Sequence, residues 1–405
     1  ENAKLINVVD EINDDIYYLG ANDRRIALFE NVYPVPEGMS YNNYLIKDEK
    51  TCLMDGIDES VSRQFLENLT YALEGRKLDY MVVQHMEPDH CSVIPDLFKM
   101  YPEMKIISSV QAFKMMENFY HIDTKDRSIV IKEGDTLSLG KHELHFISAP
   151  MVHWPEVMMT YESTTGTLFS ADAFGAFGAM SGNIFADEVR WDHDWRDEAR
   201  RYYVNIVGKY GPQTQAVLKK ASTLDIKMIC PLHAHIWRKD FEQILSRYHQ
   251  WSTYEPQRYS VAIFYGSIYG NTQNAAEILA MKLAEEGMRS VMVFDTSKTD
   301  TSELVSRAFQ YSTLVFASAT YNAEVFDSMQ NLLTELKNHN LSNRTIGLVE
   351  NGSWAPMAAN KMKAQLASMK NMKIVDPIVK IQSSVSEENL KQLEVLAKEL
   401  AANTK

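Results

Sequence analysis

Six consecutive residues, 85–90, constrain this chain most, because four of them carry side chains that can bind a metal ion. They read His-Met-Glu-Pro-Asp-His and follow an apolar run at 80–84 that predicts a buried strand. Pro88 restricts its own φ angle and disfavours helix at Glu87, so the six residues are predicted to form a partly extended loop. They indicate a metal site, although a solvated polar loop that caps a helix at 94–100 is the alternative.

Three further stretches repeat the pattern of an apolar strand that runs into a possible metal ligand. Residues 146–150 lead to His153, 167–171 lead to Asp172, and 227–231 lead to His233. A lone histidine of this kind is more often packed or exposed than metal-bound. Four such placements in one half of the chain are what loops at one edge of a sheet would supply, and together they favour a metal site.

The chemistry of the candidates narrows the choice of metal. The seven candidate ligands are His85, Glu87, Asp89, His90, His153, Asp172 and His233. They are too many for one tetrahedral zinc ion and about right for two cations that share a bridging carboxylate. Asp172 is the candidate bridge because it stands alone among the strand ends. Imidazole with carboxylate suits iron or manganese as well as zinc, and is typical of non-haem iron that handles oxygen.

Length and composition limit the classes of function. The 405 residues favour two domains, and 45% hydrophobic with 23% charged residues is ordinary for a globular protein with a substantial core. A net charge of −13 argues against nucleic acid as a partner. The three cysteines form no C-x-x-C pair, so we expect no iron–sulfur or rubredoxin-type site. Free thiols and the lack of a long apolar run predict a cytoplasmic protein without a membrane partner.

The pattern of the first half breaks at 254–258, where Pro256 marks a linker between predicted domains 1–255 and 256–405. In the first domain, apolar strands and helices alternate irregularly, which predicts two mixed sheets covered by helices. In the second, strands at 260–265, 291–294, 313–317, 345–349 and 378–381 alternate with helices. This predicts a doubly wound five-stranded parallel sheet, whose ligands bind at the carboxyl ends of the strands.

The first strand of the second domain runs into a loop rich in glycine, serine and threonine at 266–272, followed by a helix. Backbone N–H groups and hydroxyls in such a loop cradle a phosphate. The loop lacks the lysine of a P-loop and the G-x-G-x-x-G of a dinucleotide site, which favours a terminal monophosphate. Tyr321 and Trp354 lie in the neighbouring strand-end loops, where their rings could flank a flat ligand; the alternative is that both belong to the core.

The H-x-E-x-D-H motif resembles the metallo-β-lactamase superfamily, whose hydrolases usually carry histidine where this chain has Glu87. That glutamate, together with residues 183–188 and 231–237, is similar to the flavodiiron proteins, and the second half resembles flavodoxin. The resemblance implies an αββα sandwich domain followed by a flavodoxin-like domain. It implies two iron ions with an oxo or hydroxo bridge: His85, Glu87, His153 and Asp172 match the ligands of one iron. Asp89, His90, Asp172 and His233 match those of the other. In some members the histidine that matches His90 turns away from the metal, and His193 and His235 match no ligand position.

By the same resemblance, the second domain binds FMN. Its phosphate would be held by Ser267, Ile268, Tyr269, Gly270, Asn271 and Thr272. Its ribityl chain and ring system would be lined by Thr320, Tyr321, Asn322, Asn351, Gly352, Ser353 and Trp354.

The implied activity is reduction of O2 to water, of NO to N2O, or of both, with His85, Glu87, Asp89 and Asp172 carrying the catalysis. Electrons would pass through FMN from an external donor, either rubredoxin or a flavin or deazaflavin reductant, since no fused donor domain is expected. The family implies a head-to-tail homodimer or a dimer of dimers, in which Trp154 would meet the partner's flavin. Tyr202 or Tyr203 would tune the choice between the gases. The alternatives are a dizinc hydrolase with a regulatory flavodoxin domain and a pure electron carrier.

Overall fold

The computed structural model describes residues 9–404, which form two compact units. The first unit ends at His249 and the second begins at Gln250, a few residues before the linker expected from the sequence. The division into domains 1–255 and 256–405 itself stays a prediction. None of the helices in the described range has the length and apolarity that a membrane-spanning segment needs.

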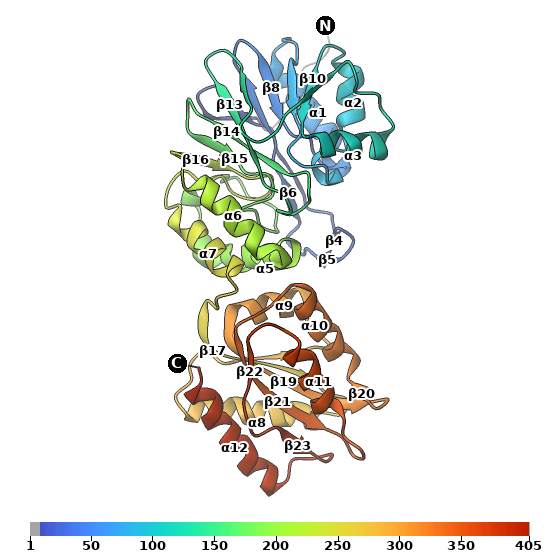
Figure 1. Cartoon of the computed structure of the whole chain (residues 1–405), viewed down its shortest axis with the longest axis vertical. Coiled ribbons are helices and arrows are strands. Elements are labelled where there is room, and N and C mark those ends of the chain that lie inside the picture. The colour runs from blue at the N-terminus through green and yellow to red at the C-terminus, as the bar shows by residue number, and fades with distance from the viewer. Residues whose placement is uncertain (1–8, 405) are drawn as a thin grey trace. The chain divides into compact units, whose positions relative to one another are not determined.

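Two sheets face each other in the first unit (Figure 1). The first sheet has the strand order β1-β2-β7-β8-β9-β10-β11; it is antiparallel from β1 to β8 and parallel from β8 to β11. Its strands are β1 (Asp10–Asn13), β2 (Ile16–Tyr18), β7 (Tyr44–Lys47), β8 (Thr51–Met54), β9 (Tyr80–Val82), β10 (Lys105–Ser108) and β11 (Ser128–Val130). The second sheet runs in sequence order through β12 (Thr136–Ser138), β13 (Glu143–Ser148), β14 (Met158–Glu162), β15 (Thr167–Phe169) and β16 (Met228–Cys230).

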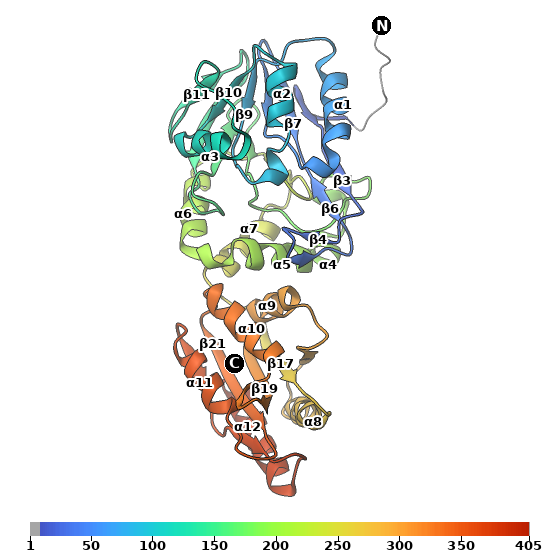
Figure 2. The same cartoon turned by 90° about the vertical axis from the view of Figure 1, so that its right-hand side faces the viewer.

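Helices cover the outer faces of both sheets, which gives the predicted αββα sandwich (Figures 1 and 2). The helices on the side of the first sheet are α1 (Ser62–Leu73), α2 (Ile94–Met100) and α3 (Val110–Tyr120). Those on the side of the second sheet are α5 (Arg196–Ile206), α6 (Gly211–Ala221) and α7 (Glu242–Ser252), preceded by the short α4 (Trp191–Asp194). Single 3-10 turns are η1 (Glu59–Val61), η2 (Pro88–His90), η3 (Ala186–Glu188) and η4 (Gly208–Tyr210).

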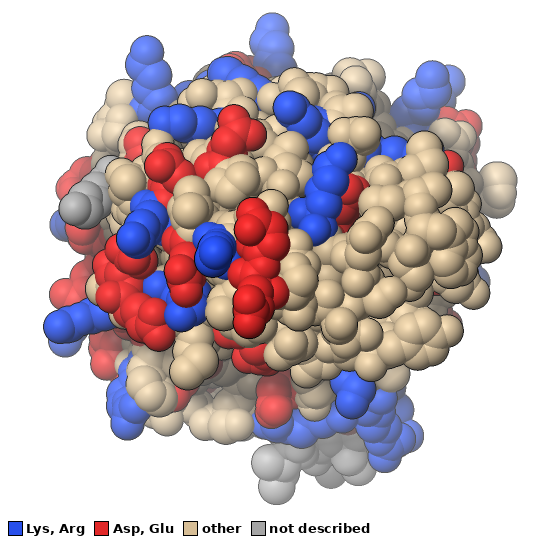
Figure 3. Space-filling view, turned by 90° about the horizontal axis from the view of Figure 1, so that it is seen from below, with Lys and Arg blue, Asp and Glu red and all other residues tan. Residues whose placement is uncertain are grey.

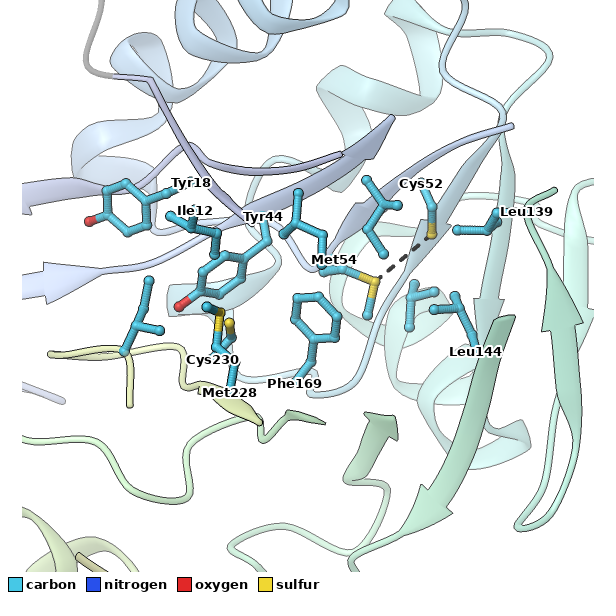
Figure 4. Close-up of a cluster of buried hydrophobic side chains, with 14 of the residues drawn as sticks. Ile12, Tyr18, Tyr44, Cys52, Met54, Leu139, Leu144, Phe169, Met228 and Cys230 are labelled. Atoms are coloured by element: carbon cyan, nitrogen blue, oxygen red, sulfur yellow. Dashed lines mark hydrogen bonds between the residues drawn. The ribbon is translucent and has the colours of Figure 1, made fainter. Parts of the chain in front are cut away.

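The core of the first unit lies between the two sheets (Figure 4). Tyr44 and Met54 point into it from the first sheet, and Phe169 and Met228 point into it from the second. All four are buried. Burying such side chains contributes about 1.5–3 kcal/mol each. The hydrophobic core thus holds the two sheets together, and the polar loops at the strand ends lie at its edge.

The second unit has the strand order β18-β17-β19-β21-β22, with all four of these pairings parallel. The strands are β17 (Arg258–Gly266), β18 (Met292–Asp295), β19 (Tyr311–Tyr321), β21 (Arg344–Asn351) and β22 (Met372–Ile374), with β23 (Val379–Ile381) also parallel to β21 and β20 (Glu324–Val325) antiparallel to β19. The fifth position of the predicted sheet is therefore filled by two short strands. The helices are α8 (Asn271–Glu285), α9 (Thr301–Gln310), α10 (Asp327–Asn338), α11 (Ala358–Ala367) and α12 (Glu387–Ala402).

Two small two-stranded sheets complete the first unit, and charged residues of both signs lie on the surface. In the first unit β3 (Ala21–Asp23) pairs with β6 (Met39–Tyr41), and β4 (Leu28–Phe29) pairs with β5 (Tyr33–Pro34). Figure 3 shows a face on which acidic and basic side chains are interspersed, next to a broad area that carries neither. Although the chain has a net charge of −13, its acidic residues do not form a single acidic patch on this face.

Candidate metal centre and flavin pocket

The loop that follows β9 changes direction at Pro88, and this change separates its ligands. Glu87 is extended, with φ −64° and ψ 133°, whereas Pro88–His90 form the 3-10 turn η2. The extended conformation is the one that a following proline imposes, so the prediction for Glu87 is confirmed. His85 and Glu87 consequently belong to one group of side chains, and Asp89 and His90 belong to another.

The remaining ligands come from three strands whose carboxyl ends share one edge of the second sheet. Strand β13 is antiparallel to β14, which is antiparallel to β15, and β15 is parallel to β16. Asp172 and His233 each lie three residues after their strands end, at Phe169 and Cys230, and His153 lies five residues after β13. The sheet topology therefore places all three ligands next to the loop that follows β9.

In the first group, four ligand atoms lie within 4.8 Å of one another. His85 Nε2 is 3.2 Å from Glu87 Oε2 and 3.3 Å from His153 Nε2, and His153 Nε2 is 2.9 Å from Glu87 Oε2. Asp172 Oδ2 lies 3.1 Å from His85 Nε2 and 3.2 Å from His153 Nε2. Ligand atoms held about 2.1 Å from one ion lie about 3.0–3.4 Å from each other, so this spacing fits a single metal ion.

The second group contains Asp89, His90 and His233 and uses the other oxygen of Asp172. His90 Nε2 is 3.2 Å from Asp89 Oδ2, and His233 Nε2 is 3.1 Å from the same oxygen. Asp172 Oδ1 lies 2.8 Å from His90 Nε2 and 3.4 Å from His233 Nε2. One carboxylate thus offers Oδ2 to the first group and Oδ1 to the second, which is the arrangement of a bridging ligand.

Burial and missing hydrogen bonds test whether this set fits metal ions. All seven side chains, hereafter the metal cluster, are buried. Within the described residues, both carboxylate oxygens of Asp89, Oδ2 of Asp172 and Nε2 of His233 lack a hydrogen-bond partner. Buried polar atoms without partners are costly, and cations supply what these lone pairs lack. The donor set of four imidazoles and three carboxylates, with no thiolate, fits a pair of iron ions.

The charges inside the metal cluster shift one another's pKa. Burial opposes ionisation of Glu87, but its contacts with His153 and His85 outweigh burial and hold its pKa well below the usual range. Burial likewise opposes a charged His153, but Asp172 and Glu87 raise its pKa to about 9. A metal binds the neutral imidazole, so occupation of the first group requires His153 to lose its proton, and metal uptake is coupled to proton release.

Two groups outside the metal cluster fix two of its four histidine rings, and sequence reasoning missed both groups. His85 Nδ1 donates to Glu156 Oε1 at 2.7 Å, and His233 Nδ1 donates to the carbonyl oxygen of Ser40 at 2.7 Å. Because Nδ1 carries the proton in each bond, Nε2 keeps a free lone pair, and this lone pair faces the cluster. A backbone carbonyl leaves no trace in a sequence; Glu156 is visible only as a carboxylate three residues after His153.

A surface pocket of about 690 Å³ opens onto Glu87 and Asp89. Trp154 lines it, with its ring 5.2 Å from that of His85. Of the two candidate tyrosines, Tyr202 is the one beside the metal cluster, with its ring 5.5 Å from that of His233; Tyr203 packs against Tyr248 instead.

The two histidines set aside as structural lie outside both metal groups. His193 is exposed and pairs with Asp194. His235 is buried with its ring 4.5 Å from that of Trp195.

The second unit holds a pocket of about 390 Å³ at the carboxyl ends of β17, β19 and β21. Its lining includes twelve of the thirteen residues expected to bind FMN: Ser267, Ile268, Tyr269, Asn271, Thr272, Thr320, Tyr321, Asn322, Asn351, Gly352, Ser353 and Trp354. The thirteenth, Gly270, does not line the pocket but precedes α8 with φ +102°, a conformation that favours glycine. The amino terminus of α8 and the neutral hydroxyls beside it fit a phosphate group.

Tyr321 and Trp354 are 53% and 82% exposed, so the structure rejects the alternative that they belong to the core. Ser383 is a lining residue that sequence reasoning missed. Its backbone exchanges two hydrogen bonds with the Asn351 side chain, at 2.8 and 3.0 Å, and its hydroxyl lies 2.8 Å from that of Ser353. It follows β23 by two residues, and the rule that ligands lie beyond strand ends could have found it.

Comparisons with known proteins match both units of the chain. The family model described as ODP family beta lactamase matches residues 39–234, and the flavodoxin model matches residues 263–394. The chain is 29% identical over 363 residues to the anaerobic nitric oxide reductase flavorubredoxin of Escherichia coli, an alignment that covers 88% of this chain and 74% of that protein.

Solved structures match almost the whole chain. The rubredoxin oxygen:oxidoreductase of Desulfovibrio gigas superimposes with a TM-score of 0.92 at 27% identity, covering 98% of both chains. A mutant of the flavo di-iron protein of Thermotoga maritima gives 0.89 at 27% identity, again over 98% of both chains. A metallo-β-lactamase-like unit that takes two iron ions, joined to a flavodoxin-like unit that takes FMN, makes this chain a member of the flavodiiron proteins, which are oxidoreductases.

Proposed function

We propose that this chain reduces O2 to water, NO to N2O, or both, at two iron ions held by the metal cluster. The position of Asp172, with one carboxylate oxygen toward each ligand group, is the observation that carries the proposal. The named relatives are an oxygen oxidoreductase and a nitric oxide reductase, which supports a gas substrate. We assign His85, Glu87, His153 and Asp172 to one iron, and Asp89, His90, Asp172 and His233 to the other.

When bound, the iron pair supplies the electrons and coordination positions that a diatomic gas needs, and FMN supplies two further electrons. The chain's own residues do the rest. The carboxylates of Glu87, Asp89 and Asp172 offset the charge of two cations inside a buried site, and Glu156 and Ser40 hold two of the imidazoles in the required tautomer. The pocket lined by Trp154 gives a small molecule access to Glu87 and Asp89.

The flavin pocket is proposed as the electron entry point. Its neutral phosphate cradle suits FMN, and the exposed rings of Tyr321 and Trp354 are placed to flank the isoalloxazine. A separate donor, such as rubredoxin or a flavin or deazaflavin reductant, would reduce the FMN. We also propose a head-to-tail homodimer or a dimer of dimers, in which Trp154 meets the partner's flavin, and a cytoplasmic location.

The test combines metal analysis with turnover. Purified protein should contain two iron ions and one FMN per chain. With FMN reduced through rubredoxin, it should consume O2 without releasing peroxide, or NO with formation of N2O, and the two rates define the preferred gas. Glu87→Ala or Asp172→Ala should abolish turnover while FMN stays bound. Two zinc ions and no iron would favour the dizinc hydrolase instead, and peroxide as the sole product would favour an electron carrier.

A further inference from the structure

Glu156 is a buried carboxylate next to the metal cluster that does not belong to either ligand group. Its side chain is fully buried. Oε1 accepts hydrogen bonds from His85 Nδ1 at 2.7 Å and from the Met86 backbone N–H at 2.8 Å, while Oε2 is buried without a hydrogen-bond partner among the described residues. A carboxylate oxygen of Glu156 therefore accepts from a single imidazole of the cluster.

The two metal groups have matching ligand types, and the first differs in that Glu30 also forms a side-chain hydrogen bond with Glu87. Each has two imidazoles, one carboxylate of its own and one oxygen of Asp172. Any difference in metal affinity must then come largely from the groups behind these ligands. Because the two ligand sets match, the hydrogen bonds to the far side of each histidine ring are among the contacts that can make the two metal affinities differ.

The Nδ1 atoms of three of the four imidazoles have different surroundings. A carboxylate, Glu156, accepts from His85, whereas a neutral backbone carbonyl, that of Ser40, accepts from His233. His90 Nδ1 is buried and has no hydrogen-bond partner in the described part of the chain. When Nε2 of His90 binds a metal, Nδ1 carries the proton and has no acceptor for it.

These contacts favour metal binding by the group that contains His85 over binding by the group that contains His90. A carboxylate behind a ligating histidine fixes its tautomer and raises its basicity, and loss of such a partner typically weakens metal affinity 10–100-fold. An unpaired buried N–H disfavours ligation by His90. On the ligand assignment of the proposed function, we infer that Glu156 is a positioning residue for His85, and that it makes the first position bind metal ahead of the second. The first position is that of His85, Glu87 and His153; the second is that of Asp89, His90 and His233.

Anaerobic titration of the metal-free, FMN-bound protein with Co2+ tests this order, because the visible absorption of Co2+ reports its ligands. The parent protein should show two steps, the first tighter. Glu156→Gln removes the charge and keeps the size, and should weaken the first step about 10–100-fold. Glu156→Asp keeps the charge and should retain more of the affinity. Glu162→Gln is the matched control, because Glu162 is another fully buried glutamate beside a histidine, His142, outside both metal groups; it should leave both steps unchanged.

A second readout needs no variant. With one equivalent of Co2+, unequal positions predict the EPR spectrum of isolated ions, whereas equal positions would place a large share of the ions in magnetically coupled pairs. Coupled pairs at one equivalent would overturn the inference, and so would an unchanged first step in Glu156→Gln or equal losses in Glu156→Gln and Glu156→Asp. Uptake of fewer than two Co2+ by the parent protein would instead overturn the two-metal assignment of the proposed function. Far-UV circular dichroism confirms that each variant is folded.

Discussion

All seven side chains of the metal cluster are buried, whereas Tyr269 and Trp354 at the flavin pocket are 91% and 82% exposed. The cluster gathers charged groups from four strand ends, and its distances already match those around metal ions. The flavin pocket is lined only by uncharged residues. The difference follows from what each site holds: buried charges must be fixed by their neighbours as the chain folds, while a stacking surface is completed by the ligand itself.

The largest expected effect comes from removing the group that both metal positions share. Asp172→Ala should lose iron from both positions and lower turnover about 100-fold or more, since even outer partners of metal ligands contribute 10–100-fold. FMN content should not change. Iron analysis and flavin absorbance measure the two outcomes on one sample, and Asp194→Ala, an exposed carboxylate in the same unit, is the control. Retention of one full iron per chain would argue against Asp172 as the bridge.

The same contrast explains which parts of the sites could be predicted from the sequence. The metal ligands are chemically distinctive residues that follow apolar strands, so their type and position led to the prediction that Asp172 bridges the two groups. Glu156 and Ser383 were missed because they act by holding other residues, and one half of such a contact is not visible in a sequence. The β4–β5 hairpin and the division of the last strand into β22 and β23 were missed because strands of two or three residues carry almost no periodic signal.

Two glycine variants should separate the sites by their backbone requirements. At Gly56 an added Cβ would lie 2.8 Å from the carbonyl oxygen of His90, which also accepts the Gly56 N–H at 2.7 Å. Gly56→Ala should therefore displace the ligand loop, costing about 1–3 kcal/mol of the free energy of unfolding together with metal affinity. At Gly270 no atom lies within 4 Å of an added Cβ, but φ is +102°. Gly270→Ala should cost roughly 1–2 kcal/mol and weaken FMN binding instead.

Thermal unfolding with iron and flavin analysis checks the glycine pair. Each variant should lose mainly its own cofactor. If Gly56→Ala released FMN as readily as iron, the two units would not bind their cofactors independently.

An intermediate effect is expected from the exposed aromatic ring at the flavin pocket. Trp354→Ala should weaken FMN binding about tenfold, because stacking of a flat ring on an aromatic side chain contributes about 1–3 kcal/mol. The unfolding free energy of the flavin-free protein should change by less than about 0.5 kcal/mol, since the ring buries little surface without its ligand. Quenching of flavin fluorescence measures the affinity. Tyr259→Ala, a 66% exposed aromatic of the same unit outside the pocket, should leave it unchanged.

The smallest effect concerns Ser383, whose hydroxyl and backbone play separable roles. Ser383→Ala removes only the 2.8 Å contact with the Ser353 hydroxyl, so FMN affinity should fall less than about threefold. Asn351→Ala removes both hydrogen bonds that anchor the Ser383 backbone and should weaken binding more, by about 1–2 kcal/mol. If the two variants were equivalent in a fluorescence titration, the Ser383 hydroxyl would be the feature that matters. FMN binding would then depend on specific polar contacts, as metal binding by the cluster does, rather than on stacking between the flavin ring and exposed aromatic side chains.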